Sequence, residues 1–166
     1  MMDENNPQIN PVDSCINILN VLLASLTIFE RNVKIAHWNY QSSIDFIQTH
    51  VWLDTVHDDI CESIDAVAEE IRKADRFPDA DLATCLGKSL VAPVTGAEPF
   101  NKAKTFSMLQ VGLFNIRKIA DDLSTMADEN KFWTIQDLAN DILKKTNHHL
   151  YFVKNTVVEP NISRAD

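Results

Sequence analysis

Residues 50–72 read HVWLDTVHDDICESIDAVAEEIR, and a polar stripe within them decides how the chain is interpreted. Two pairs of metal-ligand residues stand at i, i+4 spacing, His50 with Asp54 and Asp65 with Glu69. Asp65 follows Asp54 by eleven residues, which is close to three helical turns. Both pairs therefore lie on one side of a helix. At about 1.5 Å rise per residue the two aspartates are roughly 16 Å apart, whereas ligands lie within about 2–2.6 Å of an ion. One copy of this helix cannot close such a site, but two antiparallel copies can.

The apolar residues of the same segment occupy a different face of the helix. With about 100° per residue and His50 at zero, the stripe extends from zero to about 100°. The residues expected in the core fall between about 240° and 320°, and they are Leu53, Val56, Ile60, Ile64, Val67 and Ile71. A partner subunit explains a helix that is apolar on one side and carries ligands on another. The alternative interpretation is that the acidic residues of the stripe are merely solvated.

Composition narrows the class of protein. The 166 residues are 45% apolar and 23% charged, which is typical of one globular domain. Only three glycines occur, and the six prolines lie near the ends or between residues 78 and 99, a pattern that favours long uninterrupted helices. The net charge of −9 provides no basic surface of the kind that binds nucleic acids.

The cysteines and the hydropathy of the chain indicate where in the cell the protein is expected to be. Cys15, Cys61 and Cys85 are odd in number and lack CxxC spacing, so neither a zinc ribbon nor a disulfide scaffold is predicted. A reducing, cytoplasmic location is expected. The first 13 residues do not read as a signal peptide. The most apolar stretch, 16–29, is interrupted by polar residues and is expected to be too short and too polar to span a membrane.

The apolar periodicity predicts four long helices and a short one. The long helices are expected at about 13–38, 44–74, 100–128 and 134–157, and the short one within 79–88. Asp13 or Ser14 is the expected cap of the first helix, and Thr134 that of the last. The segment 75–99 is long enough to cross the bundle. We therefore predict an all-α fold, an antiparallel four-helix bundle with a short helix in the long crossover between the second and third long helices. One domain covers 1–166, with flexible tails at 1–12 and 158–166.

A second imidazole joins the stripe from the first helix. His37 lies near the end of that helix, in the run Ala36-His37-Trp38-Asn39, and a short loop separates it from His50. Three ligands of one chain, His37, His50 and Asp54, can therefore face Asp65 and Glu69 of a partner. Mixed imidazole and carboxylate ligands suit Fe(II), with Zn(II) and Mn(II) as substitutes.

This set of residues resembles the signature of the Dps proteins, or miniferritins. The likeness rests on His37-Trp38-Asn39, on His50 and Asp54, and on the run DAVAEEIR at 65–72. The segment HLYFVK at 149–154 is similar to the end of the family pattern, so the resemblance extends from about residue 12 to 157. The spacing of thirteen residues from His37 to His50 is one longer than is usual in the family, and the loop lacks the usual glycine.

The resemblance implies a fold, an assembly and an activity. The fold is a ferritin-like four-helix bundle, and the assembly is a hollow dodecamer with di-iron sites at its two-fold interfaces. The activity is that of a ferroxidase, which oxidises Fe(II), preferably with hydrogen peroxide, and stores ferric mineral inside the shell, thereby limiting oxidative damage. By the same resemblance His37, His50 and Asp54 bind metal from one subunit, and Asp65 and Glu69 bind it from the other.

Two further residues of the stripe, His57 and Cys61, lie midway between the ligand pairs. If the partner helix runs antiparallel, both residues approach their own symmetry mates. One interpretation is packing at the interface by a hydrogen-bonded imidazole and a small thiol. The other is an extra soft-metal site or a redox-active thiol.

Two other functions, and DNA as a partner, are alternatives to compare with the sequence. A conventional di-iron enzyme with its site inside one bundle needs two ExxH motifs on facing helices, and the sequence has none. A non-catalytic Dps-like shell or scaffold protein with an altered metal preference stays open. Tight DNA binding is not expected, because residues 1–13 contain no Lys or Arg and Arg164 is the one basic residue after Val158. Without basic tails, counterion release does not drive such binding.

Overall fold

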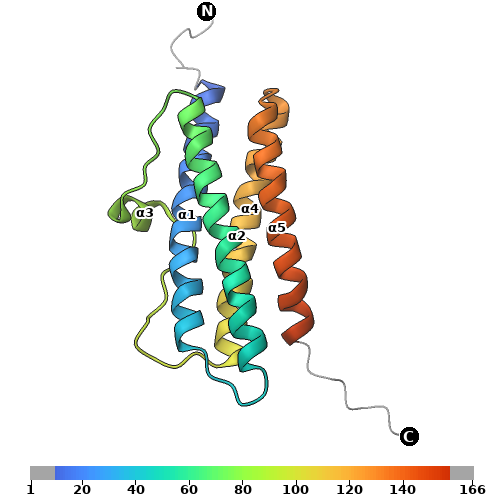
Figure 1. Cartoon of the computed structure of the whole chain (residues 1–166). Coiled ribbons are helices and arrows are strands. Elements are labelled where there is room, and N and C mark those ends of the chain that lie inside the picture. The colour runs from blue at the N-terminus through green and yellow to red at the C-terminus, as the bar shows by residue number, and fades with distance from the viewer. Residues whose placement is uncertain (1–9, 158–166) are drawn as a thin grey trace, which may run out of the picture.

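The computed structural model describes residues 10–157, and within them the chain forms five helices (Figure 1). These are α1 (Pro11–Asn39), α2 (Phe46–Lys73), α3 (Leu82–Lys88), α4 (Lys102–Glu129) and α5 (Trp133–Val157). Helix α1 packs against α2 and α4, and α5 packs against α4 and α2, which closes a four-helix bundle. The short α3 lies outside the bundle, against α1 (Figure 1). The predicted all-α bundle with a short helix in its crossover is confirmed.

The four long helices are buried to different extents in the core. Helix α1 is buried on several faces, whereas α2 is buried along a single stripe. Five of the six apolar residues expected on that stripe are buried, Leu53, Val56, Ile60, Val67 and Ile71, and Ile64 is partly buried against them. The periodicity thus identified the inner face of α2, and the ligand stripe lies off that face.

The helix ends differ from the expected ones in two places. Asn10 caps α1, because its side-chain oxygen accepts a hydrogen bond from the Val12 amide at 3.0 Å; the expected cap at Asp13 or Ser14 was wrong. Thr134 lies inside the first turn of α5 and does not cap it, since its hydroxyl donates to Glu70 Oε1 at 2.6 Å. Residues 10–12 of the predicted N-terminal tail therefore belong to α1 and its cap. The structure does not describe residues 1–9 and 158–166. The prediction about DNA binding depends on these residues and so lies outside the described part of the chain.

Buried polar side chains of α1 hold the crossover that carries α3. The Asn32 amide donates to the carbonyl oxygen of Ala92 at 2.8 Å and accepts from the Val94 amide at 3.0 Å. The Ser25 hydroxyl accepts from the Leu90 amide at 3.0 Å. These bonds pair backbone groups of the loop with side chains of α1 and hold the loop against that helix. They also explain why a helix as apolar as α1 contains polar residues on buried faces.

Helix α1 is, among the described helices, the one long and apolar enough to cross a membrane by length and composition. The expectation that 16–29 is too short and too polar to span a membrane concerned a shorter stretch than the 18-residue window of this criterion. In the structure 61% of the apolar window is buried inside the protein. The hydropathy of α1 is accounted for by its place in the core of the bundle.

Gly112 of α4 lies directly against the ring of Phe29 of α1. A Cβ atom at this position would overlap the ring of Phe29, which is fully buried. We expect Gly112→Ala to lower the free energy of unfolding by about 1–3 kcal/mol, because the ring cannot move without straining its neighbours. Gly87 is the matched control: it has open space around its Cβ position, so Gly87→Ala should be neutral or slightly stabilising. Urea unfolding of both variants measures the difference, and equal stabilities would contradict the packing argument.

Candidate metal centre

The loop between α1 and α2 sets the position of the predicted ligands. His37 lies in the last turn of α1, and His50 and Asp54 lie in the first turns of α2. The loop is pinned to the start of α4, because the Phe100 amide donates to the Asn39 carbonyl and the Gln41 amide donates to the Phe100 carbonyl, both at 2.9 Å. These bonds fix the angle at which the chain leaves α1 and enters α2.

Asp45 is a further anchor of this loop, and it is acid-sensitive. Hydrogen bonds from Ser42, Tyr40 and Lys102 lower its pKa from 3.8 to about 2. Because the pKa is lower in the folded chain, the resulting stability is present above about pH 4 and is lost as the pH falls towards 2. We expect Asp45→Ala to be less stable than the wild type near neutral pH and to converge with it at about pH 2. Unfolding curves at several pH values measure this, and a stability difference that does not change with pH would contradict the assignment.

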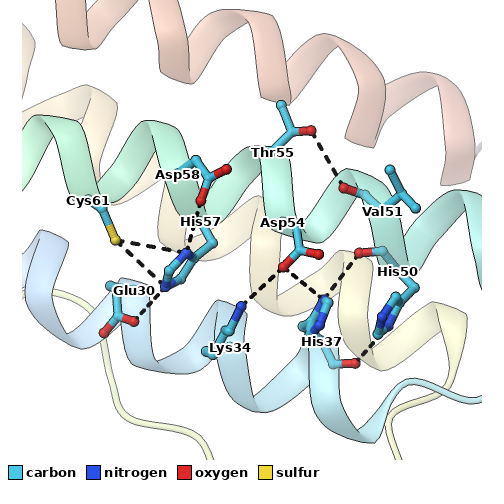
Figure 2. A network of polar contacts seen from close by, with 10 residues as sticks. All are labelled: Glu30, Lys34, His37, His50, Val51, Asp54, Thr55, His57, Asp58 and Cys61. Atoms are coloured by element: carbon cyan, nitrogen blue, oxygen red, sulfur yellow. Dashed lines mark hydrogen bonds and ion pairs between the residues drawn. The ribbon is translucent and has the colours of Figure 1, made fainter.

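Three of the five predicted ligands come together in one chain. The His37, His50 and Asp54 ligand atoms all lie within 4.8 Å of one another. The two imidazole rings are stacked, with centroids 3.8 Å apart. Each Nδ1 lies near the backbone carbonyl oxygen of the other histidine, at 3.1 and 3.2 Å (Figure 2). A carbonyl oxygen only accepts, so each Nδ1 carries a proton in these bonds, and Nε2 is the ring nitrogen left to bind a metal ion.

Burial favours the neutral form of the His37 ring, which is the form that binds metal. It lowers the pKa of His37, an effect that the nearby Asp54 carboxylate partly offsets and the His50 ring reinforces. A neutral imidazole is a ligand, whereas a protonated one is not. Two imidazoles and a carboxylate that converge in this way can bind a divalent transition-metal ion.

Lys34 is a member of this site that the sequence analysis missed. Its Nζ lies 3.1 Å from Asp54 Oδ1, and His37 Nδ1 lies 3.3 Å from the same oxygen (Figure 2). The hydrogen bond from Lys34 is the main cause that lowers the pKa of Asp54. Lys34 precedes His37 by three residues, a spacing that places both on one face of α1 and could have identified it. A cation that binds Asp54 Oδ1 competes with this ammonium group.

The other two predicted ligands are not part of this cluster. Asp65 and Glu69 are exposed in the second half of α2, beyond His57 and Cys61. A single chain therefore brings together three of the five predicted ligands. Whether a second copy brings its Asp65 and Glu69 opposite Asp54 stays a prediction.

His57 and Cys61 belong to a separate cluster, which also contains Glu30 of α1. The Glu30 carboxylate Oε1 lies 2.8 Å from His57 Nε2, and Cys61 Sγ lies 3.6 Å from the same nitrogen (Figure 2). Burial raises the pKa of the Cys61 thiol, and the charges of Glu30 and Asp58 raise it further. Because the thiolate is the reactive form, this environment argues against the redox-active thiol. Glu30 was missed by sequence reasoning, although it precedes His37 by seven residues on the same face of α1.

Comparison with known proteins places the chain in a family. The ferritin-like domain family matches residues 16–161. The chain belongs to the ferritin-like family. No curated protein matches at a significant level.

Solved structures of Dps proteins share the fold over most of the chain. Dps from Staphylococcus aureus has a TM-score of 0.83 at 19% identity, covering 89% of this chain and 97% of that one. The antigen TpF1 from Treponema pallidum has a TM-score of 0.87 at 17% identity, with coverages of 95% and 100%. Dps from Vibrio cholerae has a TM-score of 0.83 at 20% identity, with coverages of 95% and 99%. The ferritin-like chain thus has the fold of Dps proteins, as the sequence motif predicted.

Proposed function

We propose that this ferritin-like protein is a cytoplasmic miniferritin that oxidises Fe(II) and stores the ferric product inside a hollow dodecamer. The observation that supports it best is the convergence of His37, His50 and Asp54, two imidazoles and a carboxylate offered to one ion. The proposal adds the partner's Asp65 and the partner's Glu69, which complete a di-iron site across a two-fold interface. This arrangement follows from the roughly 16 Å that separates the two ligand pairs along α2.

The chemistry follows from having two irons at one site. Each Fe(II) gives up one electron, so a pair reduces one hydrogen peroxide to two waters with the uptake of two protons. Paired transfer avoids the release of a hydroxyl radical, which would follow from reduction by a single iron. Five protein ligands shared by two ions leave coordination positions open for the oxidant. Protection of the cell from peroxide and free iron is the expected benefit.

The surface around the cluster supports contact with another subunit. Large apolar side chains flank His37 and His50 in the sequence and are exposed in the single chain; they are Trp38, Ile44, Phe46, Ile47 and Val51. Exposed apolar groups gathered in one region are typical of interfaces between proteins. A partner that covers this region would also bring its own side chains to the cluster.

Peroxide-driven iron oxidation tests the proposal. The full chain is loaded anaerobically with Fe(II), hydrogen peroxide is added, and ferric absorbance is recorded while light scattering gives the mass of the assembly. We expect oxidation to be faster than in protein-free buffer, with the ferric product remaining bound to a dodecamer. A monomer, or a rate equal to that of buffer, would contradict the proposal.

One observation favours the second candidate, a non-catalytic shell protein with an altered metal preference. Lys34 already neutralises Asp54, which weakens the attraction of that carboxylate for a cation. In the same experiment such a protein would assemble into a shell and leave the rate of iron oxidation unchanged.

A further inference from the structure

We propose that Glu30, His57 and Cys61 form a second metal site that takes Zn(II) or an ion of similar preference. The three side chains come from two packed helices, Glu30 from α1 and the other two from α2 (Figure 2). Their ligand atoms all lie within 4.8 Å of one another. The proposal does not depend on iron oxidation, because none of these residues belongs to the His37 cluster.

The distances suit a tetrahedral ion. With Zn–N of about 2.0 Å and Zn–S of about 2.3 Å, the nitrogen and sulfur at two corners of a tetrahedron are about 3.5 Å apart. The observed distance between His57 Nε2 and Cys61 Sγ is 3.6 Å, but the same sulfur also lies 3.8 Å from His57 Nδ1, beside the ring and between its two nitrogens. Coordination through Nε2 therefore requires the Cys61 side chain to rotate towards that nitrogen. Glu30 Oε1 lies 2.8 Å from the same nitrogen, a hydrogen-bond distance that must widen by roughly half an ångström on coordination. Small side-chain movements therefore convert the contacts seen here into a coordination sphere.

The surroundings position the imidazole for this role. The His57 and Glu30 side chains are only 18% and 17% exposed, so neighbouring groups restrict their rotamers. The Asp58 carboxylate lies 3.4 Å from His57 Nδ1, on the other side of the ring from Glu30. A carboxylate beside the second ring nitrogen of a metal-binding histidine orients the ring and increases its basicity. Three ligands also leave one coordination position for water or for a group from another molecule.

The ligand types separate this site from the iron-type cluster. A thiolate together with an imidazole selects Zn(II) or Co(II) over the harder ions, whereas His37, His50 and Asp54 offer only nitrogen and oxygen. Coordination replaces the proton on the Cys61 thiol, and that proton passes to the solvent. Lys34 lies between the two clusters along α1 and pairs with Asp54, which keeps a positive charge between the sites (Figure 2).

Cobalt substitution tests the site directly. The reduced full chain is titrated with Co(II) under anaerobic conditions, and the thiolate-to-cobalt charge-transfer absorption is followed in the near ultraviolet. We expect the band to saturate at one equivalent per chain, to disappear in Cys61→Ser and to persist in Asp54→Asn. Glu62→Gln is a matched control on the adjacent exposed carboxylate, which pairs with Lys145, and it should retain the band. No band in the wild type, or a band that survives in Cys61→Ser, would overturn the proposal.

A second measurement on the unmodified wild type does not depend on the folding of any variant. Alkylation of Cys61 by iodoacetamide is followed by mass spectrometry with and without Zn(II). We expect Zn(II) to slow the reaction by at least about tenfold, because a coordinated thiolate is a poor nucleophile. In Glu30→Gln a higher Zn(II) concentration should be needed for the same protection. Equal alkylation rates with and without saturating Zn(II) would refute the site.

Discussion

Fe(II) binding to the His37 cluster is expected to weaken by about 100-fold or more when Asp54 is replaced by asparagine, since even outer-shell changes cost about 10–100-fold. The substitution removes the one negative charge of the cluster and leaves the Lys34 ammonium without its partner. Both changes oppose the arrival of a divalent cation. Asp54 is 46% exposed, so the variant should fold. Anaerobic calorimetric titration with Fe(II) measures the affinity, and the rate of ferric product formation after peroxide addition should fall in parallel.

Replacement of Lys34 by methionine is the matched control, because it removes the cationic partner of the Lys34–Asp54 ion pair and leaves the carboxylate in place. Methionine keeps much of the length of the side chain and removes the cation that competes for Asp54. The affinity for Fe(II) should rise by about 1.4- to fivefold, the amount expected when an exposed ion pair worth about 0.2–1 kcal/mol is lost. Asp54→Asn and Lys34→Met must therefore move the affinity in opposite directions. Changes in the same direction would show that Asp54 is not a ligand.

The fold could be predicted from the sequence because local patterns determine it. The apolar stripe on α2 and the placement of prolines in the crossover were sufficient to give four long helices and their order. The caps were harder to predict, because several polar residues compete near each helix end. Thr134 was the expected cap of α5, yet its hydroxyl bonds to the buried Glu70 carboxylate on α2. That contact is tertiary, and nothing in the local sequence reports it.

The candidate site was predictable where its members share one helix. His50 and Asp54 follow from i, i+4 spacing, and His37 follows from its closeness to the loop. Glu30 and Lys34 were missed because their roles depend on which face of the apolar helix α1 meets α2. In the structure α1 presents Glu30, Lys34 and His37 at i, i+4 and i+7, and they meet His57, Asp54 and His50 in reverse order along the antiparallel α2. A search for polar residues with matching spacings, read in opposite directions along two consecutive helices, would have identified Glu30 and Lys34.

The roles of Asp65 and Glu69 differ in kind, because they depend on a second copy of the chain. Complementation between two inactive variants is the experiment that isolates this dependence. Variant A carries Asp54→Asn, and variant B carries Asp65→Asn with Glu69→Gln. Each variant alone should lose peroxide-driven iron oxidation, because every site in its assembly lacks ligands. All three substitutions are at side chains that are not buried in the single chain, so each variant should fold.

Mixed assemblies of A and B should recover activity if the site is shared between subunits. In a mixed pair, one of the two symmetry-related sites combines the defects of both variants, and the other combines the intact halves. Random pairing makes half of all pairs mixed, so about a quarter of the wild-type rate is expected from an equal mixture. Variants mixed only after each has assembled are the control and should stay inactive. A site completed within one chain predicts no recovery in either mixture, and full activity of variant B alone would remove Asp65 and Glu69 from the site.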